Sequence, residues 1–210
     1  MQAVIFDLDG TLIDSREGIF WQFEELTREF NGEPATRQTI AAAMHGTTEA
    51  IIRTLVPNAD ANFARVSTRH AELWAQSMDF HRLYPGSEDL LAILRRLDIQ
   101  LGVVTAGDHR TISVLNKAGV LHHFNVVVSS ADDVQPKPHP GGVLLALSKL
   151  GVKPHEAVMV GDTPADIQAG KNAGLKTVAV THGFGTHEAL RAAAPDHLVN
   201  DIPSLLDVLE

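Results

Sequence analysis

The sequence contains no cysteine. Disulfides, thiolate zinc sites and cysteine nucleophiles are therefore excluded. A chain without cysteine also agrees with a reducing compartment. No apolar run approaches the roughly eighteen residues that a membrane-spanning helix needs. The N-terminus shows no basic segment followed by an apolar one, which is the pattern of a signal peptide. We therefore expect a soluble, cytoplasmic protein that does not bind a membrane.

Basic residues are also in the minority. The 17 lysines and arginines are outnumbered by 26 aspartates and glutamates, which gives a formal net charge of -9. Nucleic acid is not an expected partner, because its binding requires a basic stripe. An anionic substrate would have to be attracted by local groups such as a metal ion, one lysine and backbone N–H groups. The 11 histidines form no H-E-x-x-H zinc pattern.

The composition is sufficient for a sizeable core. Of 210 residues, 44% are hydrophobic and 20% are charged, close to the averages for globular proteins. Residues 14–83 contain helical periodicity and no strand-like run, whereas strands and helices alternate from residue 84 onward. This alternation predicts a parallel sheet with right-handed crossovers and helices on both faces. We therefore predict an α/β fold with a doubly wound parallel sheet (1–14 and 84–210) and an inserted all-helical domain (15–83).

The expected elements follow from the apolar patterns and the turn signals. The strands are Val4–Phe6, Gln100–Thr105, Val126–Ser129, Ala157–Val160, Lys176–Val180 and His197–Val199. In the insertion, a first helix begins after Asp14-Ser15. Three further helices span about 36–44, 47–55 and 62–78. Those of the remaining chain span about 87–97, 109–118, 141–150, 164–173, 187–193 and 203–209.

Two carboxylates follow the first predicted strand. Asp7 and Asp9 are two residues apart, so both side chains can point to the same side of an extended chain. Carboxylates so close together repel each other unless a proton or a cation lies nearby. Hard oxygen donors without cysteine or histidine beside them suit Mg²⁺. For this stretch alone, an ordinary polar turn ending in Gly10-Thr11 is the alternative.

Further polar residues stand at the carboxyl ends of later strands, where ligands bind in such sheets. They are Thr105-Ala106-Gly107, Pro136-Lys137-Pro138 and Gly161-Asp162-Thr163-Pro164-Ala165-Asp166. Each has a structural alternative when it is taken singly. Thr105 could be β-branched filler, Lys137 a solvated lysine, and Asp166 a helix-capping residue that pairs with Thr163. Their joint placement favours one polar site.

In this order, Asp7-x-Asp9-Gly10-Thr11, Thr105, Lys137 and Gly161-Asp162-x-x-x-Asp166 resemble the four motifs of the haloacid dehalogenase (HAD) superfamily. The helical block after the first motif resembles the first type of cap domain in that superfamily. Tyr84-Pro85-Gly86 is similar to the segment that commonly follows this cap. The resemblance covers the whole chain and implies a Rossmann-type core of the phosphoglycolate phosphatase and β-phosphoglucomutase-like subgroup.

The resemblance implies a role for each motif residue. Asp7 would be the nucleophile that forms an aspartyl-phosphate, and Asp9 the general acid and base. Lys137 would neutralise the charge on Asp7 and on the phosphate. The expected phosphate-binding residues are Gly10, Thr105, Ala106, Gly107 and Lys137. Mg²⁺ would be bound by the Asp7 side chain, the Asp9 carbonyl and Asp162, with Asp166 in close support.

The helical insertion would select the substrate. His45, which precedes a glycine between two helices, is the candidate for contact with the substrate. His70 lies on an apolar stripe and is expected in the core, whereas Arg53 and Arg69 are expected to be solvated. The substrate class would be a small phosphorylated metabolite. Phosphoglycolate, sugar phosphates, nucleoside monophosphates and pyrophosphate all remain compatible with the sequence.

The resemblance implies an Mg²⁺-dependent phosphatase. Carbon-attacking dehalogenases and phosphonatases lack an acid two residues after the nucleophile, where this chain has Asp9. Ala106 departs from the asparagine that many relatives carry, which implies the loss of one side-chain contact. Two alternatives remain open. One is a phosphomutase of the β-phosphoglucomutase type, and the other is a non-catalytic binding protein on the same scaffold.

Overall fold

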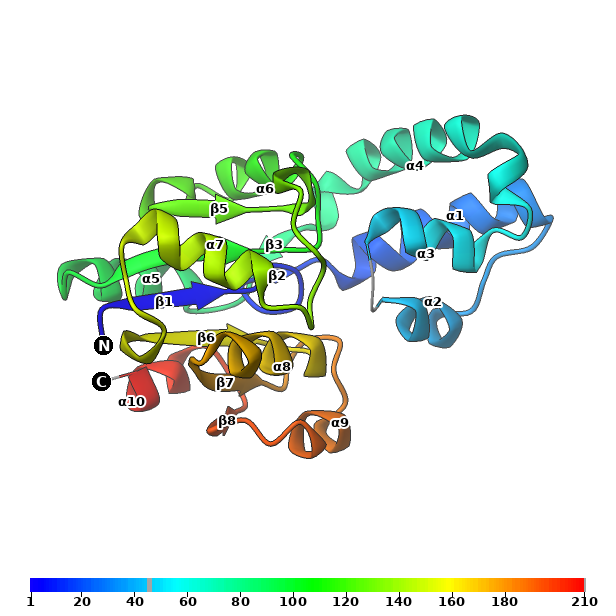
Figure 1. Cartoon of the computed structure of the whole chain (residues 1–210). Coiled ribbons are helices and arrows are strands. Elements are labelled where there is room, and N and C mark those ends of the chain that lie inside the picture. Colours follow the sequence, from blue (N-terminus) through cyan, green and yellow to red (C-terminus); the bar gives the residue numbers. More distant parts are fainter. Residues whose placement is uncertain (45–46, 210) are drawn as a thin grey trace. The chain divides into compact units, whose positions relative to one another are not determined.

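Six parallel strands form the central sheet in the computed structural model, which describes residues 1–44 and 47–209 (Figure 1). The spatial order is β5-β4-β1-β6-β7-β8. The bounds are β1 Ala3–Phe6, β4 Gln100–Val104, β5 Val126–Val128, β6 Ala157–Gly161, β7 Lys176–Val180 and β8 His197–Val199. The predicted α/β fold with a parallel sheet and a helical insertion is confirmed.

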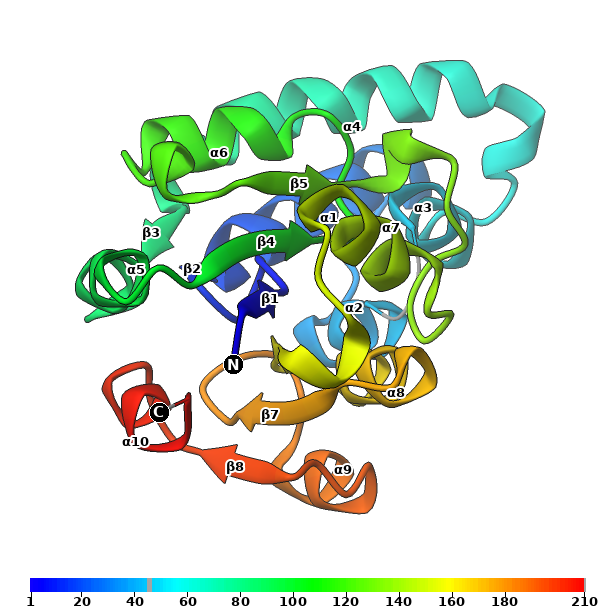
Figure 2. The same cartoon turned by 60° about the vertical axis from the view of Figure 1, so that its left-hand side comes forward.

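The sheet is covered by helices on both faces. Helices α7 and α8 lie over one face, and α5 and α10 lie over the other (Figure 2). Because both faces are covered, β1 consists entirely of buried apolar residues. The helices of this unit are α5 Ser87–Arg96, α6 Thr111–Lys117, α7 Gly141–Leu150, α8 Pro164–Ala173, α9 His187–Ala192 and α10 Leu206–Leu209.

The register of the sheet determines which residues meet at its carboxyl edge. Phe6 of β1 lies opposite Val103 of β4 and Val160 of β6. Asp7 therefore lies just beyond the strand, and its N–H donates to the Val160 carbonyl at 2.9 Å. The chain moves from β1 to β4 and β5 on one side and then crosses to β6, β7 and β8 on the other. In doubly wound sheets, such a reversal next to β1 marks the place where ligands bind.

The chain divides into two compact units, residues 1–14 with 83–210 and residues 15–82. The second unit contains α1 Arg16–Asn31, α2 Arg37–Ala43, α3 Thr48–Leu55 and α4 Phe63–Ser77, with short 3₁₀ turns at Ala59–Asn62 and Met78–Phe80. Helices α1 and α4 pack against each other. His70 of α4 is buried with its ring centroid 5.1 Å from that of Phe23, so the prediction of a core histidine is confirmed.

Two very short strands were not predicted. β2 (Ile13–Asp14) and β3 (Arg82–Leu83) pair as a separate two-stranded sheet, so the prediction that residues 14–83 contain no strand is wrong at its ends. A strand of two residues is too short to show the alternation from which strands are predicted. Among the described residues, no helix combines the length and the apolar character needed to cross a membrane.

Candidate active site

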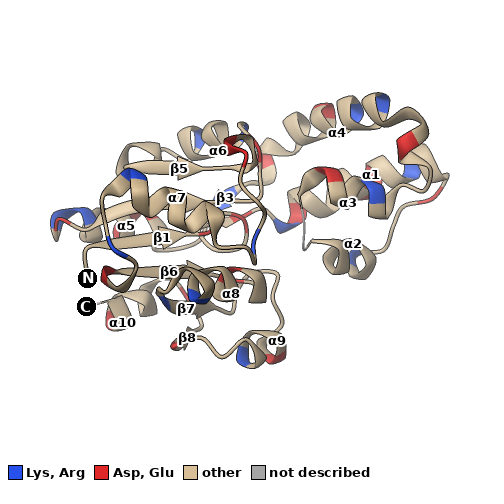
Figure 3. Ribbon diagram, in the orientation of Figure 1, with Lys and Arg blue, Asp and Glu red and all other residues tan. Residues whose placement is uncertain are grey.

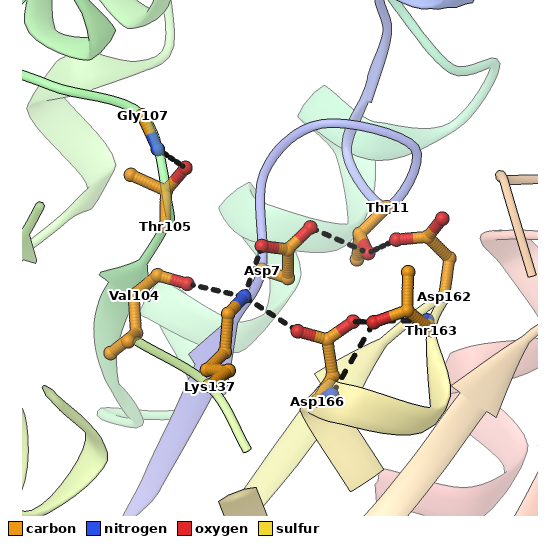
Figure 4. A network of polar contacts seen from close by, with 9 residues as sticks. All are labelled: Asp7, Thr11, Val104, Thr105, Gly107, Lys137, Asp162, Thr163 and Asp166. Atoms are coloured by element: carbon orange, nitrogen blue, oxygen red, sulfur yellow. Dashed lines mark hydrogen bonds and ion pairs between the residues drawn. The ribbon is translucent and has the colours of Figure 1, made fainter. Parts of the chain in front are cut away.

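The carboxyl edge of the sheet brings polar side chains from several segments into one network (Figure 4). Asp7 follows β1, Lys137 comes from the loop before α7, and Asp162 and Asp166 lie at the junction of β6 and α8. Thr11, in the turn after β1, lies between Asp7 and Asp162. These residues are far apart in the sequence, and the parallel sheet is what brings them together.

Lys137 is the cation of this network. Its Nζ lies 2.5 Å from Asp7 Oδ1 and 2.5 Å from Asp166 Oδ1, and it donates to the Val104 carbonyl at 3.1 Å. The side chain is only 11% exposed, so Lys137 is not a solvated surface lysine. One ammonium group thus serves two buried carboxylates.

Asp162 is held on both carboxylate oxygens. Oδ1 accepts a hydrogen bond from the Thr11 hydroxyl at 2.9 Å, and Oδ2 accepts one from the Phe184 N–H at 2.7 Å. Gly10 approaches this carboxylate so closely that an added Cβ would lie 2.4 Å from Oδ2. The Thr11 hydroxyl is also 3.4 Å from Asp7 Oδ2. Because a hydroxyl has a single hydrogen, its main donation goes to the nearer Asp162 oxygen.

Asp166 has two structural functions at once. With Thr163 it forms the capping box of α8, since Asp166 Oδ2 accepts from the Thr163 N–H at 2.9 Å and from the Thr163 hydroxyl at 2.5 Å. Its other oxygen pairs with Lys137. The capping role that the sequence offered as an alternative is therefore real, and it fixes the Asp166 carboxylate beside Lys137.

Burial strongly shifts the protonation equilibria of the network. Removal from water raises the pKa of the Asp7 carboxyl well above its ordinary value; Lys137 opposes this shift, and the charges of Asp166 and Asp162 add to it. Burial likewise raises the pKa of Asp162 to about 7, with a further contribution from Asp166. Burial lowers the pKa of Lys137, but the attraction of Asp166 and Asp7 outweighs it, so its pKa is raised overall.

Asp7, Asp162 and Asp166 form a group that could hold a metal ion. One carboxylate oxygen from each lies within 4.8 Å of the others, and all three residues are buried. Three carboxylates with one lysine leave an excess of negative charge, which adds to the effect of burial in raising the pKa values of Asp7 and Asp162. A divalent cation would compensate this excess, and an all-oxygen donor set suits Mg²⁺. The residues present therefore fit such an ion.

The same motifs match a known family. The family model for haloacid dehalogenase-like hydrolases matches residues 4–180, which include every motif residue of the network. The chain belongs to the haloacid dehalogenase-like hydrolase family. The resemblance found in the sequence is thereby confirmed.

Curated relatives of this HAD-like hydrolase match it over nearly its whole length. The chain is 33% identical to pyrophosphatase PpaX from Bacillus pumilus, over all of this chain and 96% of the relative. It is 27% identical to phosphoglycolate phosphatase from Pseudomonas putida, over 98% of this chain and 78% of the relative. A crystal structure of a predicted phosphoglycolate phosphatase from Haemophilus somnus has the same fold. Its TM-score is 0.93 at 21% identity, and the match covers all of this chain and 98% of the other.

Some residues predicted for the site lie beside the network without joining its contacts. Asp9 is half-buried in the turn after β1, and its carboxylate is not part of the group formed by the three buried aspartates. Thr105 is buried after β4, and its hydroxyl accepts the Gly107 N–H at 3.0 Å (Figure 4). Ala106 and Gly107 are half-buried in the same loop. His45 lies outside the described residues.

The structure adds contacts that the sequence did not single out. The Thr11 hydroxyl and the Val104 carbonyl join the network, and the segment Thr181–Gly185 after β7 supplies the N–H that binds Asp162. One signal could have indicated this segment. Gly183 and Gly185 follow a predicted parallel strand, at the edge where ligands bind in this HAD-like core.

Proposed function

We propose that this HAD-like hydrolase is an Mg²⁺-dependent phosphatase that hydrolyses a small phosphate monoester through an aspartyl-phosphate on Asp7. The observation that carries this proposal is the pairing of buried Asp7 with Lys137, next to two further buried carboxylates. The family membership and the names of the relatives agree with it, because a phosphoglycolate phosphatase and a pyrophosphatase both act on small phosphorylated compounds.

In the first step, a carboxylate oxygen of Asp7 attacks the phosphorus atom. The Asp7–phosphorus bond forms as the bond from phosphorus to the leaving oxygen breaks, and Asp9 donates its proton to that oxygen. In the second step, Asp9 takes a proton from a water molecule that attacks the phosphorus atom. The bond to Asp7 then breaks, and inorganic phosphate leaves. Asp9 thus acts first as an acid and then as a base.

Charge stabilisation is the main contribution of the remaining residues. Phosphoryl transfer needs positioning and stabilisation of negative charge more than it needs covalent chemistry. Lys137 holds Asp7 and would neutralise charge on the phosphoryl oxygens. Gly10, Thr105, Ala106 and Gly107 would bind the phosphoryl group. The insertion 15–83, including His45, would act as the cap that limits which ester enters.

The proposed ligands of Mg²⁺ are the Asp7 and Asp162 carboxylates and the Asp9 carbonyl, with Asp166 in support. When bound, Mg²⁺ supplies positive charge that stabilises the phosphoryl group in the transition state. The Asp162 carboxylate is held by hydrogen bonds from Thr11 and Phe184, and the Asp166 carboxylate by one from Thr163. Both carboxylates are therefore oriented before a ligand arrives.

The test is phosphate release from a panel of phosphorylated compounds, with Mg²⁺ and with EDTA. The panel contains phosphoglycolate, sugar phosphates, nucleoside monophosphates and pyrophosphate. We expect turnover that requires Mg²⁺ and is lost in Asp7→Asn, which keeps the shape of the side chain but weakens the nucleophile. Turnover that persists in Asp7→Asn would contradict the proposal.

A phosphomutase of the β-phosphoglucomutase type is the second candidate, because it would use the same acid and nucleophile. Such an enzyme returns the phosphoryl group to a sugar instead of to water. Failure to release phosphate from any compound of the panel, together with sugar phosphate isomerisation that is stimulated by a sugar bisphosphate, would favour the mutase. Failure of both assays would favour a binding protein.

A further inference from the structure

The segment Thr181–Gly185, which follows β7, wraps around Asp162. Besides the bond from the Phe184 N–H to Asp162 Oδ2, the Gly185 N–H donates to the Asp162 carbonyl at 3.1 Å. Gly183 makes this approach possible, since an added Cβ would lie 2.1 Å from Asp162 Oδ2. We call residues 181–185 the strap. The strap holds both the side chain and the backbone of one proposed metal ligand.

The strap also contacts the turn after β1. His182 Nε2 lies 3.0 Å from the Thr11 carbonyl. A carbonyl oxygen can only accept, so Nε2 carries the proton and donates it. The Thr11 hydroxyl in turn donates to Asp162 Oδ1. These contacts form a closed ring. Asp162 is bonded to the strap, His182 of the strap is bonded to Thr11, and Thr11 is bonded to Asp162. Thr11 and Asp162 are both fully buried.

His182 is itself fixed by Tyr84. The centroids of the two rings are 4.0 Å apart, and the Tyr84 hydroxyl donates to the His182 carbonyl at 3.2 Å. Tyr84 is buried, and its N–H donates to the Leu12 carbonyl at 3.0 Å. The Tyr84 ring and the Thr11 carbonyl therefore orient the imidazole together.

We propose that His182 is a positioning residue for the divalent-cation site, which it serves by holding Thr11 so that the Thr11 hydroxyl orients Asp162. This assignment rests on the proposed function, because it takes Asp162 as a ligand of Mg²⁺. Groups that orient metal-binding side chains affect metal affinity by about 10–100-fold when they are removed. His182 would act on the site through Thr11 without touching the ion or the substrate.

The substitution His182→Phe separates this role from packing. Phenylalanine keeps a ring that can stack on Tyr84 but cannot donate to the Thr11 carbonyl. His187→Phe, on an exposed histidine in α9, is the matched control. For each full-length variant, we would measure the dissociation constant of Mg²⁺ by calorimetry and the thermal midpoint in EDTA. We expect about tenfold weaker Mg²⁺ binding in His182→Phe only, and partial recovery in His182→Gln, whose amide is a donor.

A second arm tests the route through Thr11. Thr11→Val removes the hydroxyl that contacts Asp162 and keeps the backbone carbonyl. It should weaken Mg²⁺ binding, and the addition of His182→Phe should weaken it little further, because the two changes break the same path. If the losses of Mg²⁺ binding free energy in the two single variants added fully in the double variant, His182 would not act through Thr11.

The remaining outcomes are equally decisive. Unchanged Mg²⁺ affinity in His182→Phe, with only a lower thermal midpoint in EDTA, would overturn the proposal and leave His182 a packing residue. Failure of the wild type to bind Mg²⁺ at all would instead overturn the proposed function, and the assignment of His182 with it. The wild-type titration therefore distinguishes the two failures.

Discussion

Lys137 compensates the negative charge of two buried carboxylates in the site. Its Nζ is shared by Asp7 and Asp166, and its side chain is almost completely buried. The removal of one partner from a buried ion pair is costly because the remaining charge loses its compensation without regaining water. In Lys137→Met, two carboxylates would lose their cation at once.

We therefore expect Lys137→Met to lower the free energy of unfolding in EDTA at pH 8 by about 3–5 kcal/mol. The loss should be smaller at pH 5.5, where the carboxylates can take up protons. Lys149→Met is the control, because Lys149 pairs with Asp132 at the surface and is 45% exposed. Surface pairs contribute about 0–1 kcal/mol. Chemical denaturation of the three proteins makes the comparison, and equal losses in both variants would refute the account of Lys137.

Asp162 should make the metal-free protein less stable as the pH rises. Its pKa in the folded protein is about 7, above the ordinary value of 3.8, so between these values the folded state binds more protons than the unfolded state. Stability falls with rising pH wherever the folded state holds the extra proton. The unfavourable contribution of Asp162 is therefore fully developed above about pH 7 and disappears below about pH 4.

Asp162→Asn removes this ionisation. In EDTA, the thermal midpoint of the wild type should fall between pH 5.5 and pH 8, and the fall should be smaller in the variant. Mg²⁺ should raise the midpoint of the wild type at pH 8 but not that of the variant. Asp98→Asn, at an exposed position, should behave as the wild type does. If the variant kept the full pH dependence of the wild type, Asp162 would not be its source.

At the scale of elements, the N-terminus of α8 combines helix formation with the site. Thr163 caps the helix, and the same side chain donates to Asp166, which in turn pairs with Lys137. Loss of a threonine cap costs about 1 kcal/mol. The position of the proposed metal ligands thus depends on how this helix begins.

Thr163→Ala should lower the free energy of unfolding by about 1 kcal/mol and also weaken Mg²⁺ binding. Thr186 provides the control, because its side chain caps α9 by accepting from the Ala189 N–H at 3.2 Å. Thr186→Ala should show a similar loss of stability with unchanged Mg²⁺ affinity. Denaturation and calorimetry on both variants test this. A similar change in Mg²⁺ affinity in both would mean that the cap of α8 has no specific link to the site.

Elements with strong local signals could be predicted from the sequence, and elements without them could not. The bounds of α8 follow from Thr163-Pro164 at its start and Gly174, with a φ of 83°, after its end. Strands β2 and β3 depend on pairing between distant residues. Each has only two residues, which is too short for a strand pattern to be recognised in the sequence. The Thr181–Gly185 strap was missed for a related reason. Its contacts use two backbone groups, the Phe184 N–H and the Thr11 carbonyl, which almost every residue type supplies.

At the scale of the whole molecule, the net charge of -9 does not favour an anionic ligand. Acidic and basic residues are interspersed on the helices of both units (Figure 3). The attraction for a phosphate group must therefore come from the site itself. Asp7, Lys137, Asp162 and Asp166 all belong to the unit formed by residues 1–14 and 83–210. Their gathering could be predicted from the alternation of strands and helices, because the carboxyl ends of parallel strands lie at one edge of the sheet.

The account depends most directly on Asp7 as the acceptor of the phosphoryl group. The decisive measurement is mass spectrometry of the enzyme after acid quenching during turnover with Mg²⁺ and the best substrate of the panel. We predict a fraction of the protein that carries one phosphoryl group, located on Asp7 by fragmentation and absent from Asp7→Asn. Rapid turnover with no phosphoryl group on Asp7, or with one on another residue, would contradict the central claim.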